Sequence, residues 1–311
     1  MKILRSILCC IPVLMLSPLA AVGQTQDRTT VVTAANGTQS AALPAGVIDD
    51  LGQLEEAGLY TPKFGINAGT QLQYVSNALQ QGHNGSADLL FVPTLNVTAL
   101  QPLPAGFSLD AVAQLDSVIY TRYSSLNFWG PSGTAHLNWQ YKSWLPLIYF
   151  GTEPYDYQGF NGTNVTAAST ITTGIAQSIP LGWDGRTQLM LAYKFSEYYA
   201  HPAIDDRSAN LATVTLNHNF TSTLSAQAFY SYQYSYYNNA LQTVDTHRFP
   251  FVYNNYYRQE SRNIAGINLI KRFNKNLTAT LSGAWIGNNS TAAGFSYQNI
   301  VVSLGVNWQF F

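Results

Sequence analysis

Ionisable side chains are scarce in this chain, but several recur in segments where polar and apolar residues alternate. The positions that fall on the polar side of such segments are Asp110, Asp116, His136, Lys142, Lys194, Arg262 and Arg272, together with the amides Gln227 and Gln233. Acidic and basic groups that face each other across an enclosed space set a transverse field on a passing solute. The same groups could instead pair with one another and fill a narrow interior. The polar side therefore predicts either a pore lining or a salt-bridged, hydrogen-bonded filling, and we favour the pore lining.

Hydrolytic chemistry would need a histidine within hydrogen-bond reach of a serine nucleophile. The five histidines are His83, His136, His201, His218 and His247, and none has a serine two residues away on its own strand face. Only a pair formed across strands could supply a catalytic site. We therefore predict no catalytic residue and no enzyme, and keep a lipid hydrolase as the third alternative.

Metal or cofactor chemistry finds little support in the chain. Both cysteines, Cys9 and Cys10, lie in the first apolar run, which leaves the rest of the chain without a thiolate ligand. The acidic residues of the expected loops are Glu153, Asp156, Asp205 and Asp206. Their oxygens could bind a divalent cation, but their spacing matches no calcium loop. We therefore interpret them as solvated loop charges. We predict no metal site and no cofactor.

The elements that must position the polar residues have a period of two. Between Leu224 and Tyr237 the even positions are apolar or tyrosine, and the odd positions are mostly serine and glutamine. Such alternation is typical of a strand with one apolar and one polar face. The same pattern predicts strands at about 64–76, 87–99, 107–121, 133–142, 145–152, 168–180, 186–198, 209–220, 223–237, 260–273, 276–288 and 297–311. These are twelve, an even number, as expected for a single-chain bacterial barrel.

The connections between these strands alternate in length. Short connections are expected at 101–106, 181–185, 221–222 and 274–275, and longer ones at 122–132, 153–167, 199–208 and 238–259. Two of the long connections are rich in aromatic residues: one has Tyr155, Tyr157 and Phe160, and the other has Phe249, Phe251, Tyr253, Tyr256 and Tyr257. These side chains could bind sugars or contact a partner, but we prefer the interpretation that they extend an aromatic collar. Membrane barrels place short turns in the periplasm and long loops outside. This parity predicts that both chain ends are periplasmic.

Composition supports a barrel in a membrane more than a soluble enzyme. Charged residues make up 10% of the 311 residues and aromatic residues 13%, including 20 tyrosines, whereas a typical soluble domain is about 25% charged. The balance of 15 basic and 16 acidic residues offers no patch for nucleic acid. Residues 1–23 have the basic start, apolar run and small-residue end of a signal peptide. Residues 24–63 are then expected to form a periplasmic leader, which contains a short helix at 47–58 or is a disordered arm. Residues 64–311 are expected to form the barrel.

The C-terminal residues carry a resemblance to a known group of proteins. The alternating set Val306, Trp308 and Phe310, followed by the terminal Phe311, resembles the signal that the barrel-assembly machinery recognises, with Phe311 one residue beyond the usual stop. Residues 263–279 resemble the last hairpin of β-barrel porins and related Gram-negative outer-membrane barrels. The resemblance is firm for roughly the last 60 residues and only architectural before them. It implies an outer-membrane location, and the assembly machinery, outer-membrane lipid and lipopolysaccharide as partners, but no particular solute.

Taken together, these patterns predict an all-β, antiparallel, up-and-down transmembrane β-barrel of about twelve strands. The function that we expect is passive passage of small hydrophilic solutes through a polar lumen. The first alternative is a nonconducting structural barrel or a component of an export system, for example one for polysaccharide. Under the pore hypothesis, we expect Lys194→Glu to change ion selectivity without unfolding the barrel.

Overall fold

The structure, a computed structural model, describes residues 63–80, 86–142, 145–160, 162, 164–182, 186–201, 203–245, 252–292 and 295–310. The predicted signal peptide, nearly all of the predicted leader and the terminal Phe311 lie outside these residues, as do His83, His247, Phe249 and Phe251. Within the described residues, no helix is long and apolar enough to cross a membrane.

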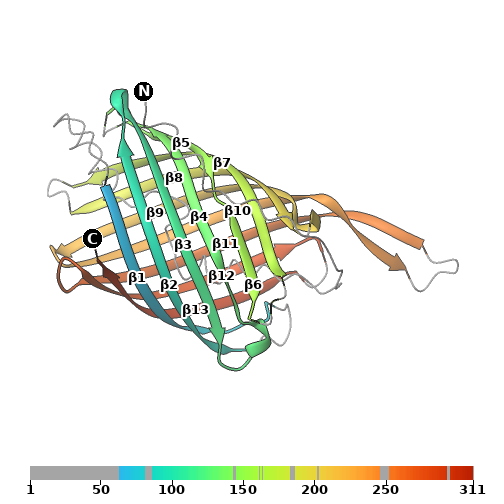
Figure 1. Cartoon of the computed structure of the whole chain (residues 1–311). Coiled ribbons are helices and arrows are strands. Elements are labelled where there is room, and N and C mark those ends of the chain that lie inside the picture. The colour runs from blue at the N-terminus through green and yellow to red at the C-terminus, as the bar shows by residue number, and fades with distance from the viewer. Residues whose placement is uncertain are drawn as a thin grey trace.

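The described strands form one antiparallel sheet that closes on itself (Figure 1). The strands are β1 (Lys63–Val75), β2 (Asp88–Pro102), β3 (Phe107–Tyr120), β4 (Phe128–Trp139), β5 (Leu147–Thr152), β6 (Tyr155–Gly159), β7 (Asn164–Leu181), β8 (Thr187–His201), β9 (Arg207–Thr221), β10 (Leu224–Asp245), β11 (Val252–Arg272), β12 (Leu277–Ser290) and β13 (Tyr297–Gln309). Closure comes from the pairing of β1 with β13. Three short 3₁₀ helices, η1 (Pro104–Gly106), η2 (Ser124–Leu126) and η3 (Ala203–Asp205), lie in the connections.

The segments β5 and β6 act as two halves of one barrel strand. Both pair with β4 on one side and with β7 on the other, and only Glu153 and Pro154 interrupt them. Because proline has no N–H to donate to a ladder, it is tolerated at such a break. The barrel therefore has twelve strands, which confirms the predicted fold class and strand number.

The two faces of the sheet separate as the alternation predicts. Large apolar and aromatic side chains point outward and are exposed, including the ladder Tyr230, Tyr232, Tyr234 and Tyr236. Polar side chains that alternate with them point inward and are buried, such as Ser231 and Ser235. Because the sheet is closed, the inward side chains meet one another instead of a second sheet. The tyrosine-rich faces are thus on the outside of the barrel.

The two ends of the barrel differ in their connections. We call the end with the connections 103–106, 182–186, 222–223 and 273–276 the turn end, and the opposite end the extended end. At the extended end, β10 and β11 continue well beyond the other strands as a two-stranded hairpin (Figure 1). The C-terminal end of the chain lies at the turn end (Figure 1).

Several predicted long connections are instead mostly strand. The hairpin pairs Asp245 with Val252, so most of the expected 238–259 loop is β-structure. Most of the expected 153–167 loop belongs to β6 and β7, and β4 begins at Phe128 within the expected 122–132 loop. β8 and β9 likewise shorten the expected 199–208 loop to η3 and its neighbours. These predictions were wrong because backbone pairing continues where the side-chain alternation weakens.

The interior near the extended end is apolar on one side. Buried apolar side chains of β1–β4, β6, β12 and β13 form one cluster, namely Val75, Leu90, Val92, Val118, Tyr120, Phe128, Tyr157, Ile286, Tyr297 and Val301, together with Ala78 just after β1. Tyr123 and Leu126 of the connection between β3 and β4 pack against it. The sequence predicts an interior lined only by amides, hydroxyls and charges. Where this cluster lies, the inner wall is apolar instead.

Candidate functional site in the barrel interior

The structure brings most of the predicted polar residues to the inner wall. Asp116, Lys194 and Arg262 are buried, and Asp110 and His136 are nearly so. Gln227 and Gln233 are half-buried among hydrogen bonds: Gln227 Nε2 donates to Asn217 Oδ1 at 2.9 Å, and Gln233 Nε2 donates to Ser235 Oγ at 2.9 Å. Their role as a pore lining stays a prediction.

Two residues of the predicted lining lie at the barrel ends instead. β4 ends at Trp139, three residues earlier than the expected strand, so Lys142 is exposed in the connection to β5. Its ammonium lies over the Tyr141 ring, 5.7 Å from the ring centroid. Arg272 is exposed as the last residue of β11, at the turn end. Neither position is deep inside the barrel.

Four ionisable side chains form a continuous row on the inner wall, which we call the ionic belt: Asp110, His136, Glu153 and Lys194. Lys194 Nζ donates to Glu153 Oε2 at 2.8 Å. His136 Nε2 lies 3.5 Å from Glu153 Oε1, and His136 Nδ1 lies 3.4 Å from Asp110 Oδ2. Asn138 Nδ2 donates to Asp110 Oδ1. The belt thus links β3, β4, the β5–β6 break and β8.

The ionic belt crosses β7 at a glycine. Gly174 pairs with Lys194 on one side and with Tyr149 on the other. A side chain at Gly174 would overlap the Tyr149 ring, which lies across this position. The glycine makes room for the inward Tyr149 ring, and Lys194 reaches past β7 to Glu153 beside it. Glu153 is therefore an interior partner of Lys194, and the prediction that it is a solvated loop charge was wrong.

A second polar group surrounds Asp116 nearer the extended end. Ser132 Oγ donates to Asp116 Oδ2 at 2.9 Å, and the Tyr157 hydroxyl donates to the same oxygen at 3.2 Å. Gln114 Nε2 donates to Asp116 Oδ1. Tyr157 belongs to β6 and is buried, so its predicted place in an aromatic loop collar was wrong. Each Asp116 oxygen has a donor, which stabilises a buried carboxylate.

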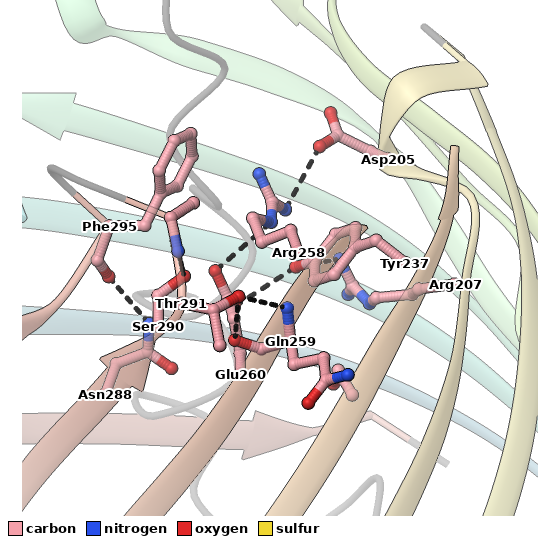
Figure 2. Close-up of polar contacts among 12 residues, drawn as sticks. Asp205, Arg207, Tyr237, Arg258, Gln259, Glu260, Asn288, Ser290, Thr291 and Phe295 are labelled. Atoms are coloured by element: carbon pink, nitrogen blue, oxygen red, sulfur yellow. Dashed lines mark hydrogen bonds and ion pairs between the residues drawn. The ribbon is translucent and has the colours of Figure 1, made fainter. Parts of the chain in front are cut away.

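At the extended end, an arginine cluster lies on the inner wall (Figure 2). The Arg258 guanidinium lies over the Tyr237 ring at 3.4 Å from the centroid and over the Phe295 ring at 4.4 Å. Arg258 Nη2 donates to Asp205 Oδ1 at 3.3 Å, and Arg258 Nε lies 3.3 Å from Glu260 Oε1. Asp205 is buried, so its predicted role as a solvated loop charge was also wrong.

A second arginine joins this cluster from β9. The Arg207 guanidinium lies 4.4 Å from the centroid of the Tyr198 ring, and Arg207 Nη1 donates to the Tyr237 hydroxyl at 3.4 Å. The Tyr237 hydroxyl in turn donates to Glu260 Oε2 at 3.1 Å. The sequence analysis missed Arg207 and Arg258 because it ended the flanking strands short of them, and it did not single out Glu260, the first residue of a predicted strand. The alternation of Arg258 and Glu260 with the outward Tyr257 was a signal that could have found these two residues.

Two of the described histidines have partners in the barrel wall. His136 contacts two carboxylates. His218 lies at the turn end, where its Nδ1 is 2.8 Å from Thr187 Oγ1 and its ring packs edge-on against Phe220. No group of three or more His, Cys, Asp or Glu side chains in the described part of the chain is arranged to hold a metal ion. The chemistry that this interior supports is charge pairing and hydrogen bonding.

Comparison with known proteins finds similarity among solved structures. No protein-family model matches the chain, and no curated protein matches it. Among solved structures, the chain is similar to an outer membrane channel from Pseudomonas putida F1, with 12% identity, a TM-score of 0.49, and coverage of 80% of this chain and 97% of that one. It is also similar to the KdgM porin in complex with disordered oligogalacturonate (9% identity, TM-score 0.43, 79% and 99% covered).

A third similar structure is LpxR from Salmonella typhimurium, with 9% identity, a TM-score of 0.42, and coverage of 76% of this chain and 99% of that chain. The chain is a closed, antiparallel, twelve-stranded β-barrel with the ionic belt and the arginine cluster inside.

Proposed function

We propose that the chain is an outer-membrane β-barrel that lets small hydrophilic solutes pass by diffusion. The observation that carries this proposal is the division between an exposed apolar outer face and a polar inner wall in a closed sheet. Exposed leucine, isoleucine, valine and aromatic side chains around a whole barrel would be costly in water but are favoured in lipid. Closure leaves no sheet edge unpaired within the bilayer.

The proposed orientation places the turn end, with the C-terminus, in the periplasm and the extended end outside the cell. Short turns face the periplasm in known membrane barrels, and longer structures face outward. The proposed N-terminal signal at 1–23 fits export across the inner membrane. In this arrangement Val306, Trp308, Phe310 and Phe311 serve the assembly machinery, and lipopolysaccharide meets the outer half of the apolar face.

A second candidate is a nonconducting barrel, structural or part of an export system. The observation that favours it is the burial of inward side chains: Asp116 is 1% exposed, Gln73 0% and Lys194 5%. Side chains that line a wide aqueous channel would keep contact with water. The apolar cluster and the arginine cluster also narrow the extended end. We infer no catalytic activity, and the corresponding test is an assay for fatty acid release from phospholipid.

Single-channel recording in planar bilayers distinguishes the two candidates. The full-length protein is first shown to be folded by its heat-dependent mobility on gels. Discrete ohmic current steps would support passive passage of ions and small solutes. A folded barrel that stays electrically silent would contradict the channel and favour the structural role. Liposome swelling with uncharged sugars of increasing size would then give the size limit.

A further inference from the structure

The arginine cluster contains a guanidinium whose surroundings resemble a carboxylate-binding site. Arg258 is 3% exposed, and rings of Tyr237 and Phe295 pack against it. Stacking of this kind leaves the edge of the guanidinium, which carries its N–H groups, available to carboxylates. Asp205 accepts a hydrogen bond at that edge, and Glu260 lies within ion-pair distance of it (Figure 2).

The two carboxylates come from different parts of the fold. Glu260 is on β11, two residues from Arg258, and therefore belongs to the wall. Asp205 ends η3, in the connection between β8 and β9, and its side chain reaches past β10 to β11. The next residue, Asp206, anchors this connection to the wall: its Oδ1 accepts from Ala200 N at 2.5 Å, and its carbonyl oxygen accepts from Asn238 N at 2.9 Å.

The Asp205–Arg258 ion pair is longer than the Lys194–Glu153 ion pair of the ionic belt. Its N–O distance is 3.3 Å, whereas Lys194 and Glu153 lie 2.8 Å apart. Strong charge-assisted hydrogen bonds between nitrogen and oxygen are about 2.7–2.9 Å long. A free carboxylate, which no chain restrains, could approach Arg258 more closely than Asp205 does. An aromatic carboxylate would in addition find the Tyr237 and Phe295 rings beside the guanidinium.

We propose that Arg258, Tyr237 and Phe295 form a binding site for an aromatic carboxylate, and that Asp205 occupies this site when no such solute is present. Binding of the solute carboxylate displaces Asp205 and releases its side chain from β11, while the segment stays tethered at Asp206 and at the Ala203 carbonyl oxygen, which accepts from Asn239 Nδ2. The extended end of the barrel is then opened by its own solute. The channel would thus be selective for aromatic carboxylates and gated by Asp205, a proposal that rests on the proposed channel function.

The test measures opening without relying on ion conduction. Ser235 faces inward on β10, is buried, and lies two residues from Tyr237. A Ser235→Cys reporter, in a chain whose Cys9 and Cys10 are replaced by serine, is labelled with a charged water-soluble maleimide in detergent micelles. Benzoate is the probe, and benzamide is its uncharged control.

The proposal predicts slow labelling that rises saturably with benzoate, by about tenfold, which corresponds to about 1.4 kcal/mol, and does not rise with benzamide. Asp205→Asn should give fast labelling without benzoate and tighter benzoate binding. Arg258→Ala should give fast labelling that benzoate does not change. Arg186→Ala, an exposed arginine at the turn end, is the matched control and should behave like the reporter alone.

Three results would overturn the proposal: fast labelling of the reporter without benzoate, no response to benzoate, or an equal response in Arg258→Ala. If Arg258→Ala does not fold, Asp205→Asn alone decides, because unchanged labelling in that variant contradicts the role of Asp205. Electrical silence in planar bilayers would contradict the proposed channel but leave the labelling result intact, so the two failures are distinguishable.

Discussion

Lys194 Nζ lies 2.8 Å from Glu153 Oε2, although β7 runs between the strands that carry them. Where β7 passes Lys194 it carries Gly174, whose missing side chain leaves room for the Tyr149 ring. Glu153 lies between β5 and β6 and keeps the inward alternation of these strands, in which Leu147, Tyr149 and Tyr157 are also buried. The ion pair thus ties the break in one barrel strand to β8.

Removal of either partner of this pair should destabilise the barrel. Glu153→Gln leaves the Lys194 charge buried without its carboxylate, and Lys194→Met does the converse, so we expect each variant to lose about 3–5 kcal/mol of unfolding free energy. The double variant Glu153→Gln/Lys194→Met should recover most of this loss because neither charge remains. Urea unfolding in lipid vesicles, followed by tryptophan fluorescence, gives the values. Additive losses in the double variant would contradict the coupling.

The same geometry changes the expectation for Lys194→Glu. The sequence predicts altered ion selectivity without unfolding, but this substitution would place a second carboxylate beside Glu153 inside the barrel. Like charges at such a distance repel strongly in a low-dielectric interior. We now expect Lys194→Glu to lower stability at neutral pH. Gel mobility with and without heating checks this, and a variant as heat-resistant as the native barrel would contradict it.

Close backbone approach of β4 to the interrupted strand should make two glycines intolerant of a side chain. A Cβ at Gly130 would overlap the Asp156 carbonyl oxygen, and a Cβ at Gly151 would overlap the Ala135 carbonyl oxygen. Gly130→Ala and Gly151→Ala should each lose about 1–3 kcal/mol of unfolding free energy, as overpacking does. Gly283→Ala, where a Cβ would meet no atom within 4 Å, is the matched control. Equal stabilities of all three variants in the urea assay would disprove the steric argument.

The outer face should reject charge in a depth-dependent way if it meets lipid. Leu281 lies in the middle of β12 and is 51% exposed, and Phe273 is 61% exposed at the turn end. Leu281→Arg should cost about 2–4 kcal/mol in a bilayer, and Phe273→Arg about 0–1 kcal/mol. Folding yield into lipid vesicles provides the comparison. A chain that folds as a soluble monomer without detergent, with Leu281→Arg harmless, would contradict the membrane assignment.

Asp88 should hold the connection between β3 and β4 in place. Its carboxylate accepts from the Thr121 hydroxyl at 2.7 Å and from the backbone N–H groups of Arg122 at 3.0 Å and Tyr123 at 3.1 Å. Asp88→Ala leaves these donors without an acceptor, which typically costs about 1–3 kcal/mol. Trypsin cleavage after the exposed Arg122 should therefore become faster. The control Asp156→Ala, at an exposed carboxylate on β6, should leave the cleavage rate unchanged. If Asp88→Ala also leaves the rate unchanged, contacts other than those of Asp88 hold the connection.

The alternation of residue types determined which face of each strand points outward. The Tyr230–Tyr236 ladder and the opposing serines could be assigned to opposite faces from sequence because successive side chains of a strand always point to opposite sides of the sheet. The number of strands followed from the same pattern. The inward position of Asp110, Asp116, His136 and Lys194 needed no more than this rule.

Only the tertiary structure decided which inward groups meet. Glu153 and Lys194 are 41 residues apart in sequence, and their contact depends on strand register and on the stagger that closes the barrel. The pairing of Asp205 with Arg258 likewise depends on how far β10 and β11 extend past their neighbours. Local sequence could not set these distances, because cross-strand partners are fixed by the closure of the whole sheet.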